Sequence, residues 1–393
     1  MTVRQILPPR RSPFAQPAVL REMREQDHLP RVTMWDGRQV WYVTRYEDAR
    51  RVLRDPRFSV VRDRGLPELS PGRDRTPGAL GRTDEPRHRE VRRLFTDEFL
   101  AGRIEALRPS IERTVAVGLE RLVSATPPVD FHTAFAMGIP AATVGSLLGA
   151  PPDARRTFRQ CLAILTDRTT TAAEKSMADR ELYACCRRLV DHKLAEPGDD
   201  IISRCVVGPL RDGRLHPEEA YHTTVQLVSG GHDTTAVTIT VGVLTLLVDP
   251  EWRQALRDQP ESVPDAVEEV LRFHTPMTDG LPRVAVEDVV VGGTRVRAGD
   301  GLLVCVASAN RDERVFDRPD ELELGRDAAR RHLAFGHGVH RCLGQWLARA
   351  EIQTAISAVA TGIPTLRLAV PVERIEFRQD SFIGGVRELP VTW

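Results

Sequence analysis

The sequence predicts a mainly α-helical fold with small antiparallel β-sheets, which places it in the α+β class. Helical periodicity dominates from about residue 87 to 260 and returns near the C-terminus, while short strand patterns with glycine turns occur on either side. The 393 residues are 41% hydrophobic and 28% charged, an ordinary globular composition that allows a large core. We expect a single domain over residues 1–393, with a β-rich portion at about 30–60, 283–310 and 364–393 and a helical portion at about 87–280 and 343–361.

The chain begins with strand, helix and loop patterns. Strands are expected at residues 31–35 and 39–44. A short helix is expected at 45–55 and a long loop at 61–86. Asp36-Gly37 between the strands is typical of a tight hairpin turn, Thr44 is a suitable N-cap for the helix, and Pro56 ends it. The loop is rich in Arg, Gly, Pro and Asp and has no period, which is typical of lids and binding segments.

Strand patterns return late in the chain. Short strands are expected within residues 283–307, with glycine turns at 292–293 and 299–300. The last helix is expected at 343–361, and two more strands close the chain. The sequence contains no internal repeat and no low-complexity segment.

Charge and cysteine usage exclude several classes of protein. The formal net charge of +0 gives no general attraction to nucleic acid or anionic lipid. The six cysteines have no regular spacing, which argues against a disulfide scaffold or a zinc ribbon and favours a reducing compartment. The N-terminal MTVRQILPPRRSPF has no apolar segment, and the longest near-apolar run, Val237 to Val248, is too short for a bilayer. We therefore expect a soluble, cytoplasmic protein that neither enters a membrane nor binds nucleic acid.

One predicted helix is unusually long and has a weak centre. It runs from Pro217 to Asp249, about 32 residues or roughly 48 Å. The segment SGGHDTT at 229–235 weakens it, because two glycines cost about 1 kcal/mol each against alanine and threonines divert backbone hydrogen bonds. One interpretation is close packing against another helix. The other is a kink that opens a groove for a small ligand, with Thr234 as a hydrogen-bond donor and Asp233 as a proton carrier.

A second pattern, EEVLRFHTP at 268–276, places Glu269 and Arg272 on one face of a helix. Taken alone, such a spacing most often marks a solvated ion pair that contributes well under about 1 kcal/mol. The pattern gains meaning only together with other motifs.

Cys342 lies in a basic, glycine-rich turn just before a predicted helix. The helix N-terminus, His340 and Arg341 all favour the thiolate form, so we expect this cysteine to be charged. A thiolate here can be a nucleophile with His340 as its base, a zinc ligand together with His337 and His340, or a haem ligand. For a nucleophile, His340 is only two residues away in a tight turn, which is a poor geometry for its base. For a zinc site, His337, His340 and Cys342 are closely spaced and no fourth ligand stands out. A haem needs one cysteine only.

The segment FGHGVHRCLG resembles the haem-binding signature of cytochrome P450s. Its FxxGxxxCxG pattern falls on Phe335, Gly338, Cys342 and Gly344. GGHDTT, which contains Gly230 and Gly231, resembles the oxygen-binding AGxET segment, with glycine in place of the usual alanine, and EVLR resembles the ExxR motif. The three motifs follow the family's order. PGDDIISRCV, SANRDERVF and LPVTW further resemble soluble actinomycete P450s that modify secondary metabolites and xenobiotics.

The resemblance implies the P450 fold, a triangular, helix-rich single domain, and roles for further residues. Four cationic side chains match contacts to the haem propionates: His88, Arg92, Arg283 and His340. Glu269, Arg272 and Arg326 match a buried structural network, and Cys342 matches the iron ligand. Gly336, Gly338 and Gly344 are expected to let the backbone approach the macrocycle. His332 and His337 are expected to be structural.

The resemblance also implies a function. A haem b monooxygenase would insert one oxygen atom from O₂ into a bulky, mainly hydrophobic molecule, such as a polyketide or macrolide, by hydroxylation or epoxidation. Asp233 and Thr234 would deliver protons. Desaturation, phenol coupling and peroxide-driven oxidation use the same haem chemistry and stay open, as does a non-catalytic haem-thiolate sensor, against which the acid-alcohol pair argues.

Electrons are expected from a ferredoxin and its NAD(P)H-dependent reductase, because the chain has no dinucleotide-binding fingerprint. Basic residues expected to steer the donor are Arg92, Arg93, Arg331, Arg341 and Arg349. The substrate pocket is expected to use residues 61–84, 155–190, 225–231, 275–281 and 381–385, with Asp279 meeting a polar group of the substrate.

Overall fold

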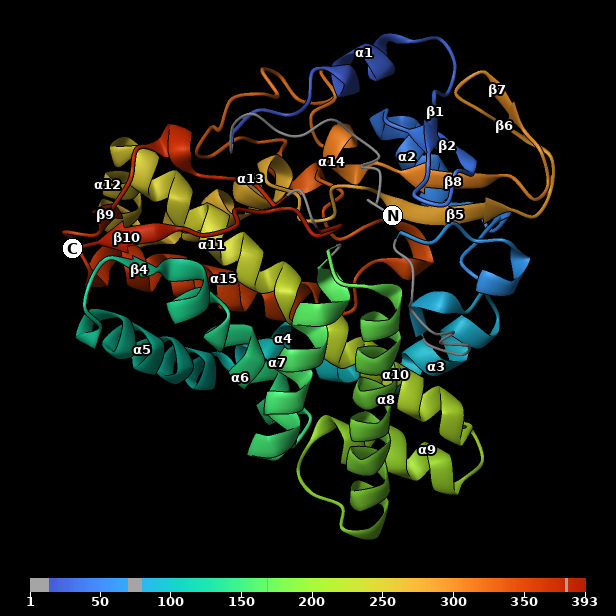
Figure 1. Cartoon of the computed structure of the whole chain (residues 1–393), viewed down its shortest axis with the longest axis horizontal. Coiled ribbons are helices and arrows are strands. Elements are labelled where there is room, and N and C mark those ends of the chain that lie inside the picture. The colour runs from blue at the N-terminus through green and yellow to red at the C-terminus, as the bar shows by residue number, and fades with distance from the viewer. Residues whose placement is uncertain (1–13, 70–79, 168, 379–380) are drawn as a thin grey trace.

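The computed structural model describes residues 14–69, 80–167, 169–378 and 381–393. The N-terminal segment 1–13 and residues 70–79, in the middle of the predicted loop, lie outside the described residues. The fold is mainly helical with small sheets, as the sequence predicts (Figure 1).

Helices account for most of the described chain. Their bounds are α1 Val19–Glu25, α2 Tyr46–Arg54, α3 Arg87–Thr96, α4 Ala101–Glu105, α5 Arg108–Ser124, α6 Gly138–Leu147, α7 Pro152–Thr166, α8 Ala172–Ala195, α9 Gly208–Arg211, α10 Pro217–Gly230, α11 Asp233–Val248, α12 Pro250–Asp258, α13 Val263–Phe273, α14 Val306–Ala309 and α15 Gln345–Gly362. The last helix thus begins two residues later than Leu343, where the sequence predicts its start.

The strands form separate small sheets. Their bounds are β1 Arg31–Thr33, β2 Gln39–Val43, β3 Phe58–Ser59, β4 Val129–Asp130, β5 Leu281–Ala285, β6 Val289–Val291, β7 Thr294–Val296, β8 Gly301–Val304, β9 Arg367–Leu368 and β10 Pro390–Thr392. The hairpin around Asp36-Gly37 and the turn at Gly292-Gly293 form as predicted, with Gly37 at a φ of 85°. The five-stranded sheet has the order β1-β2-β8-β5-β3.

Two features of the sheets differ from the prediction. β2 and β8 pair in parallel, so the largest sheet is mixed instead of purely antiparallel. The closing strand β10 lies between β9 and β4 and pairs antiparallel with both, and Figure 1 shows these three strands at the opposite side of the molecule from β1, β2, β5 and β8. The β-rich portion expected from 364–393 is therefore a separate sheet.

The start of α2 depends on a distant residue. Thr44 does not cap it; instead the backbone N–H of Tyr46 donates to Asp312 Oδ2 at 2.8 Å, from a position 266 residues away in the chain. α2 buries Tyr46, Ala49, Val52 and Leu53 and leaves its arginines on the other face. α2 packs against the short helix η8 (Gly338–His340), which begins the turn that carries Cys342.

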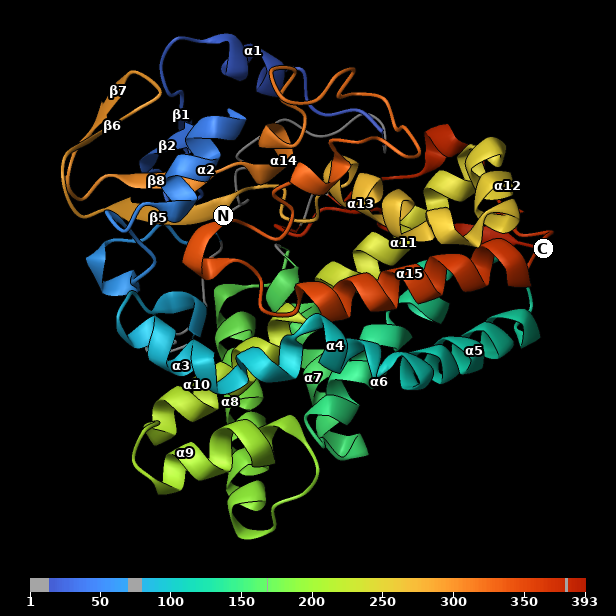
Figure 2. The ribbon, with the colours of Figure 1, turned by 180° about the vertical axis from the view of Figure 1, so that it is seen from behind.

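The long helix predicted from Pro217 is broken where the sequence is weak. α10 ends at Gly230 and α11 begins at Asp233, with His232 between them at φ −98° and ψ −76°. Taken together, Pro217–Val248 is long and apolar enough to cross a membrane, but 78% of its most apolar stretch is buried within the fold, as in the core helix of a globular protein. α11 packs against α15, and Figure 2 shows α15 running alongside it from behind.

Candidate active site

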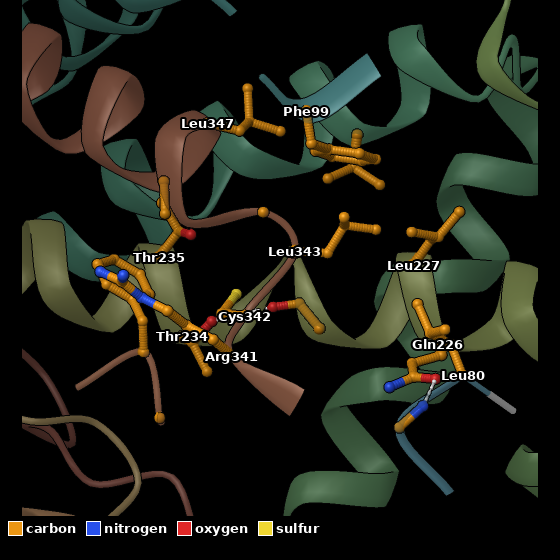
Figure 3. A pocket seen from close by; sticks show the side chains of 18 of the residues that line it. Leu80, Phe99, Gln226, Leu227, Thr234, Thr235, Arg341, Cys342, Leu343 and Leu347 are labelled. Carbon is orange, nitrogen blue, oxygen red and sulfur yellow. Dashed lines mark hydrogen bonds between the residues drawn. The ribbon is translucent and has the colours of Figure 1, made fainter. Parts of the chain in front are cut away.

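A cavity of about 320 Å³ separates α11 from the turn that carries Cys342. Its wall is mainly apolar, and Figure 3 shows Leu347, Phe99, Leu343 and Leu227 around the hollow that Cys342 and Thr234 also line. The cavity draws on α3, α6, α10, α11, α15 and the segments between them. A mainly apolar cavity with a few polar groups is the usual form of a cofactor or ligand site.

The turn before α15 is held in place by backbone hydrogen bonds. The N–H of Cys342 donates to the carbonyl of Phe335 at 2.8 Å, and Gly336, at φ 72°, lines the cavity. Gly344 also lines it, with open space where a Cβ would be. Gly338 does not face the cavity: a Cβ there would lie 2.6 Å from the carbonyl oxygen of Leu53. Its φ of 74° therefore serves packing against α2, not approach to a macrocycle as expected.

The protonation expected for Cys342 differs from what its surroundings favour. Cys342 is exposed to the cavity but lies deep within the fold, and desolvation there raises the pKa of its thiol; the N–H of Gly344 and the charges of Arg92, Arg349 and Arg341 oppose this only in part. The expected free thiolate is therefore not the favoured form of the uncoordinated side chain. A coordinating metal ion deprotonates a thiol outright, so the site fits a metal ligand better than a free nucleophile.

Histidine and arginine side chains cluster at one corner of the cavity. The rings of His88 and His340 lie 4.2 Å apart, and both line the cavity together with Arg92, whose Nη2 donates to the carbonyl of Arg341 at 2.7 Å. Burial lowers the pKa of His340 to about 3, with further lowering from His88, Arg283 and Arg92. Burial likewise lowers the pKa of Arg283 to about 10.

This corner fits the propionates of the haem that the resemblance implies. His88 Nε2 and His340 Nδ1 are buried and have no hydrogen-bond partner among the described residues. Orphaned nitrogens beside the buried Arg283 and the half-buried Arg92 leave unused hydrogen-bonding atoms and positive charge that an anionic group would satisfy. Arg283 contributes its charge from β5, although it is not among the described residues of the cavity wall. The residues present therefore fit a haem held by Cys342.

The expected acid-alcohol pair is not in contact. Thr234 lines the cavity, and its hydroxyl donates to the carbonyl of Gly230 at 3.0 Å. Asp233 is buried, is not among the described residues of the cavity wall, and accepts a hydrogen bond from His232, with 2.9 Å between Oδ1 and Nδ1. Gly231 packs so closely that a Cβ would lie 2.8 Å from Val144 Cγ2, whereas Gly230 has open space.

Glu269, Arg272 and Arg326 form a fully buried ion-pair network behind the site. Arg272 donates to both carboxylate oxygens of Glu269 at 2.7 Å, and Arg326 Nε donates to Oε1 at 3.0 Å. The remaining Arg272 donors reach the carbonyls of Asn310, Pro319 and Glu321. The pair is thus buried and not solvated, contrary to what the spacing alone would favour.

A second buried network was not singled out from the sequence. Arg349 donates to Glu268 from Nε at 2.6 Å and from Nη2 at 2.9 Å, and His332 Nε2 lies 3.1 Å from the same carboxylate. The Arg349 guanidinium also stacks 4.4 Å from the centre of the Phe335 ring. This network fixes the Cys342 turn to α13. The sequence predicts that Arg349 steers an electron donor, but its guanidinium is buried against Glu268 and is not available for this role.

Two further polar residues of the cavity wall were missed. Glu351 on α15 is buried with no partner for Oε1 among the described residues, and burial raises its pKa to about 8. Gln226 on α10 accepts a hydrogen bond from the N–H of Gly81 at 2.7 Å, which Figure 3 marks. Neither residue belongs to a motif; a polar residue on a helix face that is otherwise apolar was the available signal.

The expected pocket segments contribute unequally. Three of the segments supply lining residues, whereas 155–190 and 381–385 supply none of the described wall. The lining residues are Leu80, Gly81, Gln226, Leu227, Gly230, Gly231, Pro276, Met277 and Leu281. Val144 and Leu147 of α6 and the adjacent Leu148 line the cavity instead. Asp279 is buried but is not among the described lining residues, so the expected contact with substrate is not seen.

Comparison with known proteins identifies the family. The family model for cytochrome P450 matches residues 149–360. The chain is 40% identical to Cytochrome P450-SU2 of Streptomyces griseolus over 97% of this chain and 94% of that protein, and 40% identical to the Vitamin D3 dihydroxylase of the same organism over 93% and 90%. The solved structure of the mycinamicin VIII C21 methyl hydroxylase of Micromonospora griseorubida superposes with a TM-score of 0.92 at 36% identity, covering 98% of this chain and 99% of that one.

The family match spans more than half of the chain, and the relatives align over nearly their whole length. Their similarity agrees with the cysteine turn, the cationic corner and the broken helix that surround one apolar cavity. The chain therefore belongs to the cytochrome P450 family, whose members are monooxygenases that use haem b and O₂.

Proposed function

We propose that this protein inserts one oxygen atom from O₂ into a bulky, mainly hydrophobic secondary metabolite, by hydroxylation or epoxidation, with electrons from a ferredoxin and its NAD(P)H-dependent reductase. The observation that carries the proposal is the cavity, in which Cys342 and the hydroxyl of Thr234 line one apolar space. The relatives named for vitamin D3 and mycinamicin VIII act on large molecules, which supports a substrate of this class.

The residues would divide the work as follows. Cys342 would hold the iron, and His88, Arg92, Arg283 and His340 would hold the propionates. The haem, when bound, supplies the oxygen-activating chemistry. The apolar wall excludes bulk water and orients the substrate by shape.

Proton delivery is the task of Thr234 and Asp233. The Thr234 hydroxyl faces the cavity and can pass its proton inward if it regains one from behind. Asp233, the preceding residue, would return a proton to Thr234 from the buried side. To do so, its carboxyl must turn away from His232, to which it is hydrogen-bonded.

The substrate class is tested with purified protein, a ferredoxin system and a panel that includes vitamin D3 and mycinamicin VIII. Mass spectrometry should find a product that has gained one oxygen atom, labelled when ¹⁸O₂ is supplied. A product that has only lost two hydrogens would replace this proposal with desaturation. Oxygen derived from water, or no product with any hydrophobic compound, would contradict it.

Thr234→Ala tests the relay. The variant should consume NAD(P)H but release most of the reducing equivalents as peroxide, because the proton donor that faces the cavity is gone. Thr245→Ala is the matched control, since Thr245 bonds back to its own helix at Val241 and does not line the described cavity. Equal coupling in both variants would refute the role of Thr234.

The donor would dock over the Cys342 turn. Arg93, Arg331 and Arg341 are exposed, and Arg341 directly precedes Cys342 in the chain. Acidic ferredoxins are attracted by such a surface, mainly through a faster association rate. A soluble, cytoplasmic location is part of the same proposal.

Charge reversal tests the docking surface. Arg341→Glu should slow reduction by ferredoxin at low ionic strength and lose most of its defect in high salt, because salt screens exposed charges. Arg180→Glu is the control, since Arg180 is exposed on α8, which packs against α7 and α10. Reduction rates that do not depend on salt, or equal defects in both variants, would contradict electrostatic docking.

A further inference from the structure

The break between α10 and α11 buries two titratable side chains behind the cavity. Gly231 and Thr234 line the cavity, but His232 and Asp233 between them are not among its described lining residues. Only 3% of His232 and 8% of Asp233 is exposed. The chain therefore places an acid and an imidazole together on the side of the broken helix that faces the protein interior.

The hydrogen bond between them fixes the tautomer of the ring. Burial raises the pKa of Asp233, but the hydrogen bond from His232, the charges of His232 and Arg378 and the hydroxyl of Thr166 lower it further, so that the pKa lies below its usual value. An ionised carboxylate only accepts hydrogen bonds. His232 Nδ1, which lies 2.9 Å from Asp233 Oδ1, must therefore carry the hydrogen.

The other nitrogen of the ring is open. His232 Nε2 is buried and has no hydrogen-bond partner among the described residues. His132, on the π-helical turn His132–Ala136, lies close enough to interact electrostatically with His232, and so does Arg378 with Asp233. His132 itself is engaged, with Nδ1 2.8 Å from the hydroxyl of Thr240. An imidazole bonded to a carboxylate at one nitrogen and free at the other can carry a proton between two places.

We propose that His232 is a positioning residue that supplies protons to Asp233, and through Asp233 to Thr234. This inference rests on the proposed function, in which Asp233 and Thr234 deliver protons to the cavity.

The transfer balances without any further reactant than solvent water. His232 Nε2 takes a proton from water, the Nδ1–H bond breaks, and the hydrogen forms an O–H bond with Asp233 Oδ1, which leaves a neutral ring and a neutral acid. Asp233 then turns to Thr234 and gives up its proton. While the pair is open, the ring takes a proton from water at Nδ1 and the Nε2–H bond breaks and returns its proton to water, which restores the starting tautomer; the net result is one proton moved from solvent to Asp233.

The inference is tested by replacing His232 without removing its hydrogen bond. His232→Asn keeps a side-chain N–H that can donate to Asp233 but cannot carry a proton. His132→Asn is the matched control, because it removes a neighbouring buried histidine that bonds to Thr240 instead. All proteins must first show the thiolate-type spectrum with carbon monoxide, which establishes that the cysteine turn has folded around haem.

The readout needs no substrate. The reduced, oxygenated proteins are frozen, given one more electron by irradiation and annealed stepwise while the first proton-dependent change is followed by electron paramagnetic resonance. His232→Asn should need a clearly higher annealing temperature than the wild type, whereas His132→Asn should not. An unchanged temperature for His232→Asn overturns the inference.

Two further measurements keep the outcomes distinct. If Thr234→Ala also leaves the annealing temperature unchanged, the proposed relay itself fails; if only Thr234→Ala shifts it, the relay stands and the role of His232 falls. Nitrogen-15 resonances of labelled histidine in the carbon-monoxide form of the wild type test the starting geometry even if the variant does not fold. The resonance of His232 should show hydrogen on Nδ1, and a bare Nδ1 overturns the inference.

Discussion

Two buried polar regions of this protein look alike in composition but differ in how well they are satisfied. In the Glu269–Arg272–Arg326 network, the charged groups meet one another and the carbonyl groups of the loop at 310–321. In the corner formed by His88, His340 and Arg92, two ring nitrogens have no partner among the described residues.

The difference separates structure from function. A buried network whose donors are all used can stabilise the fold but has nothing left to bind a ligand. A buried corner with unused donors destabilises the chain unless something else completes it. The first region therefore holds α13 to the loop before the Cys342 turn, and the second is built for an anion, which the haem propionates supply.

The largest effect is expected where the satisfied network is opened. Glu269→Gln removes the negative charge that balances the buried Arg272 and Arg326. Loss of one partner of a buried ion pair costs about 3–5 kcal/mol, so urea should unfold the variant at a much lower concentration. A loss below about 1 kcal/mol would mean that carbonyl groups alone satisfy the arginines.

A smaller and different effect is expected in the unsatisfied corner. His88→Phe should accelerate haem transfer to apomyoglobin. Its effect on the stability of the haem-free protein should be small, because it removes both the unpartnered Nε2 and the contact of Nδ1 with Glu85 at 3.2 Å. Loss of a hydrogen bond to a charged group costs about 1.5–3 kcal/mol, or roughly 10-fold to 100-fold in affinity.

His222→Phe is the control for this variant, because His222 is also buried with an unpartnered ring nitrogen but packs against Tyr183, 4.9 Å away between ring centres. Equal rates of haem loss in both variants would contradict the assignment of His88.

The buried carboxyl of Glu351 should make the free energy of unfolding depend on pH. Burial raises its pKa from 4.5 to about 8, so the folded protein holds a proton that the unfolded chain releases. Between pH 4.5 and about 8 the folded state therefore binds more protons, and the free energy of unfolding should fall as the pH rises. Glu351→Gln should lack this part of the decline and gain stability relative to the wild type near pH 8. Parallel curves for the two proteins would mean that the carboxyl is solvated.

The smallest effect is expected for an ion pair on the surface. Arg330 pairs with Asp265 at 2.6 Å, but both side chains are more than half exposed. Arg330→Ala should change the free energy of unfolding by less than about 1 kcal/mol, because solvent screens the pair. A loss as large as that of Glu269→Gln would show that burial is not what distinguishes the two pairs.

Local patterns in the sequence were sufficient for the elements that depend on neighbouring residues. The hairpin at Asp36-Gly37, the break at 229–235 and the turn before α15 follow from glycine positions and periodicity. The motif residues Cys342 and Thr234 do line one cavity.

Features that join distant segments were not predictable in this way. The cap of α2 comes from Asp312, and β2 pairs in parallel with β8 about 260 residues later. The pairing of Asp233 with His232 depends on which way a side chain turns at a broken helix, which spacing alone does not determine. The pKa of Cys342 was predicted in the wrong direction, because burial outweighs the charges that the sequence makes visible.

The central claim is that Cys342, as an anion, binds the iron of a haem held in this cavity. The most direct test is the absorption spectrum of the purified protein after reduction with dithionite and saturation with carbon monoxide. Thiolate coordination predicts a strongly red-shifted Soret band that is lost in Cys342→His. A colourless protein, or a wild-type Soret band at the unshifted position typical of histidine-bound haem, would contradict the account.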